Sequence, residues 1–221
     1  MKKLVIWDLD GVITDSEKVW LKNRLNRLNA LFNLNWDFET AYKYLGGMND
    51  KKKSLVLRKM GYKTNSKFWK DQINIDMDII RRDGLELLPY VEKLIKKIQK
   101  QCIVTGDSKF RTLIKLDIIK FWKKYFNDEN VFTGDMVEHN KPDPDIFLLA
   151  AKRMKEKPKN CIAIEDSIDG LVSAQKAGMD VIAFLGCDMY KNDAYIEKVK
   201  NLGVEHICYN MKEVEKIIFS A

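Results

Sequence analysis

The chain has 221 residues, of which 46% are hydrophobic and 32% are charged, and its formal net charge is +7. This composition indicates a globular protein with a sizeable core and excludes the fibrous and disordered classes. No apolar run approaches the roughly 20 residues of a membrane span, so we expect no membrane partner. Asp8 and Asp10 interrupt the N-terminal apolar stretch well short of a signal peptide, which favours a cytoplasmic protein.

Cysteine and lysine usage narrows the possible partners. The four cysteines are far apart in the sequence: Cys102, Cys161, Cys187 and Cys208. None belongs to a Cys-x-x-Cys pair, so we expect buried, reduced thiols rather than a zinc site. Many lysines fall in helical segments such as residues 92–100, 115–124 and 152–159, which we interpret as solvated helix faces. Because no nucleic-acid-binding motif accompanies the charge, we expect no nucleic-acid partner.

Short β-rich runs alternate with helical segments along the chain. The runs cover residues 4–7, 101–105, 131–133, 161–164, 181–185 and 206–209. This alternation predicts an α/β fold with a Rossmann-like, doubly wound parallel sheet. About ninety residues separate the first two runs, far more than one crossover helix requires, and their pattern is helical. We therefore predict a discontinuous core, residues 1–15 and 87–221, with an all-helical cap domain, residues 16–86, inserted into it.

Two carboxylates follow the first run, where a buried strand should end. Asp8 and Asp10 are one residue apart, and Gly11 allows the backbone to turn sharply just beyond them. Ligands of open parallel sheets bind at the carboxyl ends of strands, so this position suits phosphoryl-transfer chemistry. The Asp-x-Asp pattern alone fits a simple turn equally well, and its companions decide between the two interpretations.

The first companion segment follows the run at residues 101–105. Thr105 ends this run, and Gly106 exposes backbone N–H groups before the next helix, so both can bind a phosphate oxygen. Lys141 comes later, just before Pro142 and Pro144, whose rings hold the lysine in a defined place. The alternative interpretation of the segment at Thr105 is a turn that caps a helix. The alternative for Lys141 is an ordinary surface lysine.

The last companion segment is the acid pair Glu165 and Asp166, which follows the run at residues 161–164. Mg²⁺ prefers oxygen ligands and needs only one or two carboxylates besides phosphate and water. Asp166 and Asp8 together could therefore bind Mg²⁺, although acids at this place also cap helices.

In this order, each at a strand end, the segments resemble the motif set of the haloacid dehalogenase superfamily. The similar subfamily has a helical cap after the first motif and includes β-phosphoglucomutase-like proteins and sugar-phosphate phosphatases. The resemblance covers essentially the whole chain. It implies a Mg²⁺-dependent phosphatase that hydrolyses a small phosphorylated metabolite, a sugar or sugar-acid phosphate, through a phosphoaspartate intermediate. We expect this enzyme to be a monomer.

The resemblance also implies a role for each matching residue. Asp8 is the nucleophile, and Asp10 is the general acid that later activates water. The expected phosphate-binding residues are Gly11, Thr105, Gly106 and Lys141, of which Thr105 and Lys141 also count as catalytic. The expected Mg²⁺ ligands are Asp8, the backbone carbonyl of Asp10, and Asp166. Glu165 binds the metal through water or orients Asp166.

Departures from the family pattern bear on the substrate. Asp107 is an acid where the family often has asparagine or serine, so it either points away from the phosphate or serves another contact. Trp20 stands where the mutases have a histidine, and the loop at residues 46–50 lacks their arginine. The expected specificity residues of the cap are Trp20, Gly46, Gly47, Met48, Asn49 and Asp50. We therefore favour the phosphatase and keep a β-phosphoglucomutase-like phosphomutase as the alternative.

Two further classes fit less well. A haloacid dehalogenase has no use for the acid that Asp10 supplies to phosphoester chemistry. A non-enzymatic binding protein on this fold would not need the whole set of polar residues at the strand ends.

Overall fold

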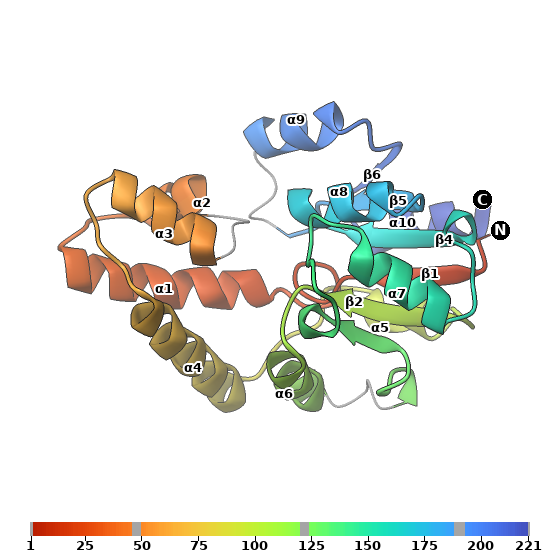
Figure 1. Cartoon of the computed structure of the whole chain (residues 1–221), viewed down its shortest axis with the longest axis horizontal. Helices are drawn as coiled ribbons and strands as arrows, with labels where there is room; N and C mark the ends of the chain where they lie inside the picture. Colours follow the sequence, from red (N-terminus) through yellow and green to blue (C-terminus); the bar gives the residue numbers. More distant parts are fainter. Residues whose placement is uncertain (1, 46–49, 120–123, 188–192, 221) are drawn as a thin grey trace. The chain divides into compact units, whose positions relative to one another are not determined.

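The computed structural model describes residues 2–45, 50–119, 124–187 and 193–220. The chain divides into two compact units (Figure 1), Met1–Asp15 with Leu85–Ala221, and Ser16–Gly84. The predicted cap covers residues 16–86, so the second unit ends two residues earlier, at Gly84. Among the described residues, no helix combines the length and the apolar character that a bilayer crossing requires.

The first unit is built on one six-stranded parallel sheet, which confirms the predicted fold class. Its strands are β1 (Leu4–Trp7), β2 (Gln101–Thr105), β3 (Val131–Thr133), β4 (Cys161–Glu165), β5 (Asp180–Phe184) and β6 (His206–Cys208). The order across the sheet is β3-β2-β1-β4-β5-β6, so the chain reverses its direction of travel at β1. The crevice at this reversal, outside the carboxyl ends of the strands, is where such sheets bind ligands.

The central strands are buried along their whole length, as expected for a sheet covered on both faces. The register pairs Trp7 of β1 with Ile103 of β2 and with Ile164 of β4. Asp8 therefore follows β1 at the level where β4 ends in Glu165. The buried indole of Trp7 also donates a hydrogen bond of 2.9 Å to Gln101 Oε1, which satisfies its N–H inside the core.

Helices connect and cover these strands. They are α5 (Val91–Ile95), α6 (Lys109–Ile119), α7 (Asp145–Arg153), α8 (Ile168–Lys176), α9 (Asp193–Asn201) and α10 (Met211–Ser220), with 3₁₀ turns η2 (Gly134–Met136) and η3 (Pro158–Asn160). Helices α7 and α8 pack against each other, and α5 packs against α10. The four cysteines are buried and not disulfide-bonded, as expected.

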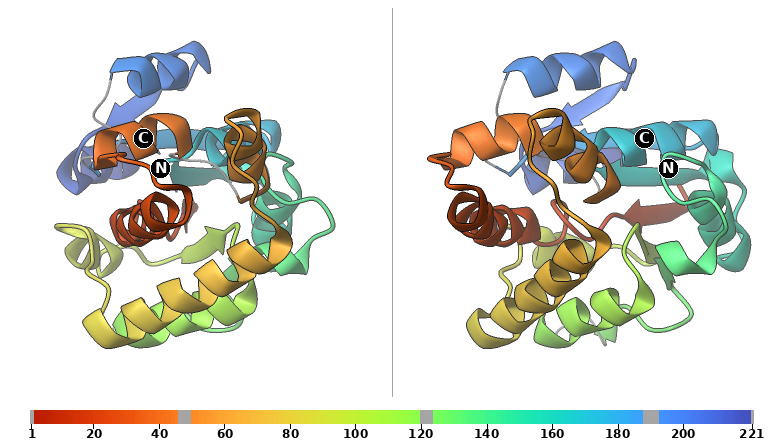
Figure 2. Two further views of the ribbon diagram at one scale, coloured as in Figure 1. Left: turned by 90° about the vertical axis from the view of Figure 1, so that its left-hand side faces the viewer. Right: turned by 60° about the vertical axis from the view of Figure 1, so that its left-hand side comes forward.

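All described elements of the second unit are helices: α1 (Ser16–Phe32), α2 (Phe38–Leu45), α3 (Asp50–Lys59) and α4 (Ser66–Asp83). Helix α1 packs against α2 and α4, which Figure 2 shows from two sides. The shared core contains Leu28, Leu45, Leu57 and Trp69. Asn65 caps the start of α4 by accepting a 2.8 Å bond from the Phe68 N–H.

Candidate active site

The predicted residues of the first unit gather at the carboxyl ends of the central strands. Asp8 directly follows β1, and Glu165 and Asp166 end and follow β4. One carboxylate oxygen from each of these three acids lies within 4.8 Å of the other two, and all three residues are buried. Three buried carboxylates at this spacing repel one another strongly unless positive charge compensates them.

Lys141 supplies part of that compensation. Its Nζ donates a 2.7 Å bond to Asp8 Oδ1, a 3.2 Å bond to the carbonyl of Val104, and a third bond to Glu165 Oε1. The three donors of the ammonium are thus all engaged. Burial by itself would lower the pKa of Lys141, but its contacts with Asp8 and Glu165 outweigh burial and raise that pKa above its usual range. Lys141 is therefore a fixed positive charge between two acids.

Glu165 is held from its other side by the turn that enters α8. Its Oε2 accepts bonds from the N–H groups of Asp166 and Ser167, both at 3.1 Å, and from Ser167 Oγ at 3.0 Å. A Cβ at Gly170 would lie 2.0 Å from the Glu165 carboxyl, so only glycine leaves room for this arrangement. Gly170 was not singled out from the sequence, because its neighbour across the turn becomes apparent only in three dimensions.

Gly11 has a comparable steric role. Its φ of +84° lies in the left-handed region, and a Cβ there would lie 1.7 Å from Asp166 Oδ2. The predicted phosphate-binding residue Gly11 thus also makes room for the side chain of Asp166. The hydroxyl of Tyr195, on α9, donates a 2.6 Å bond to the Asp166 carbonyl. Tyr195 is a contact of the site that the sequence did not indicate.

The balance of charges acts most strongly on Asp8. Burial raises the pKa of the Asp8 carboxyl well above its ordinary value of 3.8. Lys141 opposes this shift, whereas Glu165 and Asp10 add to it. Asp8 is therefore short of positive charge even with Lys141 beside it. A divalent cation among these oxygens would supply that charge, and Mg²⁺ prefers such oxygen ligands.

The loop after β2 carries Thr105 and Gly106. Thr105 is buried, and its Oγ1 accepts a 3.2 Å bond from the Asp107 N–H. The carbonyl of Gly106 accepts a 2.8 Å bond from Asn140 Nδ2. Asn140 directly precedes Lys141, so this bond ties the predicted phosphate-binding turn to the segment that carries the lysine. Asn140 was not singled out from the sequence, although its position beside Lys141 was a usable signal.

The side chain of Asp10 lies in a different set of charges. Lys115 Nζ, on α6, donates a 2.6 Å bond to Asp10 Oδ1, a second bond to Asp10 Oδ2, and a 2.5 Å bond to Asp107 Oδ2. Arg111 Nη1 pairs with Asp107 Oδ1 at 2.8 Å. From the sequence, Asp107 was expected either to point away from the phosphate or to serve another contact. The structure supports the second alternative, since Asp107 pairs with Lys115 and Arg111.

The prediction that residues 115–124 form a solvated face is wrong for Lys115, whose side chain is fully buried. Burial alone would lower the pKa of Lys115, but Asp10 and Asp107 outweigh it and raise that pKa. The spacing Thr112, Lys115, Leu116, Ile119 places the lysine on the buried stripe of α6. That spacing was a signal available in the sequence.

The predicted specificity residues belong to the second unit or to residues outside the described ranges. Trp20 lies in α1 and is buried, with 2% of its surface exposed. Gly46, Gly47, Met48 and Asn49 lie outside the described residues, and the side chain of Asp50 is likewise not described. Their assigned role stays a prediction.

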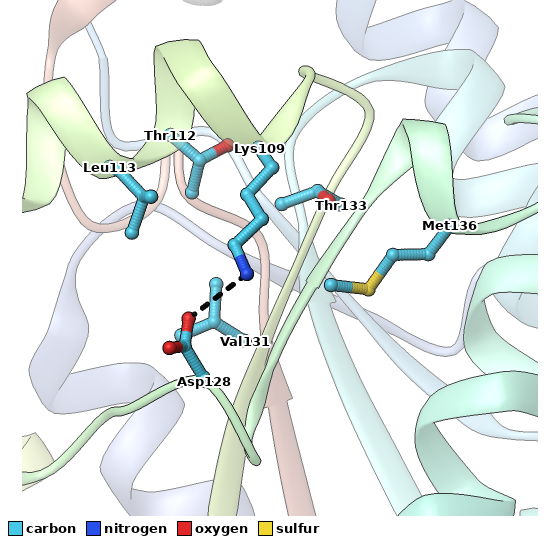
Figure 3. Close-up of a pocket in the computed structure, with 7 residues that line it drawn as sticks. All are labelled: Lys109, Thr112, Leu113, Asp128, Val131, Thr133 and Met136. Atoms are coloured by element: carbon cyan, nitrogen blue, oxygen red, sulfur yellow. Dashed lines mark ion pairs between the residues drawn. The ribbon is translucent and has the colours of Figure 1, made fainter.

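A small pocket lies beside β3 (Figure 3), apart from the acid cluster. Its lining residues are Lys109, Thr112, Leu113, Asp128, Val131, Thr133 and Met136. Lys109 and Asp128 form an ion pair of 3.4 Å across it. None of these described lining residues belongs to the predicted catalytic set, so the pocket is not part of the site.

Known proteins resemble this chain in sequence and in fold. A bifunctional riboflavin kinase/FMN phosphatase of Arabidopsis thaliana is 29% identical over 83% of this chain, which spans 49% of that protein's length. A (DL)-glycerol-3-phosphatase 2 of the same plant is 26% identical over 80% of this chain and 77% of its own. A conserved haloacid dehalogenase-like protein of unknown function from Agrobacterium tumefaciens shares the fold, with a TM-score of 0.88 at 24% identity over 100% of this chain and 99% of that chain.

The resemblance found in the motifs is confirmed by a family model, which matches residues 2–178. Its match includes the acid cluster, Lys141 and the whole of the second unit. The chain belongs to the haloacid dehalogenase-like hydrolases.

Proposed function

We propose that the chain is a Mg²⁺-dependent phosphatase that hydrolyses a small phosphorylated metabolite, a sugar or sugar-acid phosphate, through a phosphoaspartate at Asp8. The observation that carries this proposal is the buried carboxylate of Asp8 between the ammonium of Lys141 and two further acids. The two Arabidopsis relatives, an FMN phosphatase and a glycerol-3-phosphatase by name, support the reaction class.

The chain's own residues account for both steps. A carboxylate oxygen of Asp8 attacks phosphorus, and the bond from phosphorus to the ester oxygen breaks as Asp10 gives that oxygen a proton. Asp10 then takes a proton from water, which attacks phosphorus and releases Asp8 and inorganic phosphate. Thr105 and Lys141 hold the phosphoryl oxygens, because positioning and charge stabilisation dominate phosphoryl transfer. To do so, Lys141 exchanges one of its three bonds in the structure for a bond to the phosphoryl group.

The residues present fit a Mg²⁺ ion. Asp8 and Asp166 would hold it together with the backbone carbonyl of Asp10. Both oxygens of Glu165 already accept hydrogen bonds, from Lys141 and from the turn after β4, which suits a residue that orients its neighbours. A bound Mg²⁺ supplies positive charge that reduces the repulsion between Asp8 and the phosphate.

The test of this function is phosphate release from a panel of phosphorylated metabolites. We expect sugar or sugar-acid phosphates to be hydrolysed faster than an aryl phosphate, activity to vanish with EDTA, and Mg²⁺ to restore it. Hydrolysis that persists at full rate after metal removal would contradict the role of Asp166. Conversion of β-glucose 1-phosphate to glucose 6-phosphate with little phosphate released would favour the alternative phosphomutase.

Metal binding should also stabilise the fold in a pH-dependent way. Because the pKa of Asp8 is raised in the folded protein, the folded state binds more protons than the unfolded state between 3.8 and that raised value. Stability without metal therefore falls as pH rises through this interval, and Mg²⁺, which competes with the proton, opposes the fall. We expect the increase in Tm with Mg²⁺ to be larger at about pH 8 than at about pH 5.

Thermal unfolding with Mg²⁺ or with EDTA at the two pH values measures this effect. An increase in Tm that is equal at both pH values would show that the metal does not compete with the proton of Asp8.

A further inference from the structure

Lys115 makes an unusual arrangement beside the predicted acid of the reaction. Its side chain is 0% exposed, and its ammonium bonds to both oxygens of Asp10 and to Asp107. Burying an ammonium is unfavourable unless charged partners offset the loss of water. An apolar side chain at position 115 would continue the buried stripe of α6 without that penalty. The lysine therefore calls for an explanation beyond the packing of the helix.

The contacts form a line of charges that ends at Asp10. Arg111 holds one oxygen of Asp107 at 2.8 Å, and Lys115 holds the other at 2.5 Å. The side chains of Asp107 and Lys115 are both largely buried, with 14% and 0% exposed, so water competes little for these bonds. Lys115 is consequently fixed on one side by Asp107 and presents its remaining donors to Asp10.

The geometry points to Lys115 as a positioning residue that holds the carboxylate of Asp10 for the hydrolysis of the phosphoaspartate. This inference rests on the proposed function. Both oxygens of Asp10 accept bonds from this one ammonium, so the orientation of the carboxyl group is fixed. Lys115 itself touches neither water nor phosphate in this role. It acts by limiting the orientations of Asp10, and Asp107 and Arg111 limit those of Lys115.

The Lys115→Met variant tests this inference with 4-nitrophenyl phosphate as the substrate. The leaving group of 4-nitrophenyl phosphate departs without a proton, so the phosphorylation of Asp8 does not need Asp10 as an acid. With this substrate kcat/KM reports the phosphorylation of Asp8. When hydrolysis of the phosphoaspartate is the slow step, kcat reports that hydrolysis. We expect kcat to fall about tenfold or more, KM to fall by the same factor, and kcat/KM to stay within about twofold. The fraction of enzyme trapped as phosphoenzyme during turnover should rise.

A purely structural role gives a different result. Partial unfolding lowers kcat in proportion to the amount of active enzyme but leaves KM unchanged, because KM does not depend on enzyme concentration. An unchanged or increased KM, or an unchanged kcat, overturns the inference. If circular dichroism shows that Lys115→Met does not fold, Lys115→Gln, which keeps an N–H donor without the charge, gives the same measurement.

Lys109→Met is the matched control, because Lys109 lies on the same helix with half of its side chain exposed. We expect both kinetic constants to stay within about twofold of the wild type.

Hydrolysis of 4-nitrophenyl phosphate by the wild type with Mg²⁺ distinguishes a failure of the proposed phosphatase function from a failure of the role of Lys115. If the wild type is inactive on every phosphate ester tested, the proposed function fails and the role of Lys115 falls with it; if it is active, only the KM pattern decides on Lys115.

Discussion

Asp8→Asn is expected to lower kcat about 10⁴-fold or more, because the amide is neither an effective nucleophile nor a charged metal ligand. The fold should survive. Asp8 is buried beside two other acids, and the environment already disfavours its charged form. Replacing it with a neutral side chain of the same shape removes repulsion, so Tm without Mg²⁺ should stay equal or rise. The increase in Tm that Mg²⁺ gives should become small.

Steady-state hydrolysis and thermal unfolding, each with and without Mg²⁺, check this result. Asp180→Asn is the matched control, because Asp180 starts β5 in an exposed position and pairs with Lys2 at the surface. Its activity and Tm should be nearly those of the wild type. Turnover by folded Asp8→Asn within tenfold of the wild type would rule out Asp8 as the nucleophile.

Lys141→Met is expected to lower the free energy of unfolding by about 3–5 kcal/mol, because it leaves two buried acids without their shared positive charge. The side chain of Lys141 is 8% exposed and pairs with both Asp8 and Glu165. Activity should also fall strongly, since the same ammonium is expected to hold the phosphoryl group. Mg²⁺ should restore part of the lost stability, because it binds among the same carboxylates.

Urea denaturation followed by circular dichroism measures the change. Lys97→Met provides the comparison: Lys97 also pairs with an acid, Glu215, but its side chain is 44% exposed. Exposed pairs contribute about 0–1 kcal/mol, so the two variants should differ clearly. A loss for Lys141→Met no larger than that for Lys97→Met would show that the buried acids need no compensation from this lysine.

The sheet could be predicted from the sequence because its strands are continuous apolar runs that end at polar turn residues. The run at 101–105 matches β2 in full, and the run at 161–164 stops one residue short of the end of β4. That residue is Glu165, which pairs with Ala183 of β5 and whose side-chain oxygens accept bonds from Lys141 and from the turn after β4. Periodicity alone does not reveal such a buried acid.

Some residues of the site could be predicted from the sequence and others could not. Asp8, Lys141 and Asp166 stand out because each follows a strand or is framed by prolines, and the structure brings them together with Glu165. Their roles in the reaction stay predictions. Lys115 was missed because a lysine in a basic helix normally faces solvent, and its partners lie 105 and 8 residues away in the chain.

Two further residues around the site, Gly170 and Asn140, have roles that depend on contacts formed by the fold. Gly170 is needed because the Glu165 carboxyl comes within 2.0 Å of where its Cβ would stand, and Asn140 because it reaches the carbonyl of Gly106. The bond of Asn140 joins residues 34 positions apart in the chain, which meet only when the strands are aligned, and the contact of Gly170 depends on how the turn after β4 folds back on Glu165. The choice of substrate depends on residues 46–50, and it stays a prediction.

Chemical trapping of the phosphorylated residue during turnover is the most direct measurement. Borohydride reduces an acyl phosphate to an alcohol but leaves a free carboxylate unchanged, so a phosphorylated aspartate becomes homoserine. When the protein turns over 4-nitrophenyl phosphate with Mg²⁺ and is quenched with borohydride, peptide mass spectrometry should find homoserine at position 8, and none without substrate. Homoserine at Asp10 or Asp166 instead, or turnover with no homoserine at any position, would contradict Asp8 as the residue that carries the phosphoryl group.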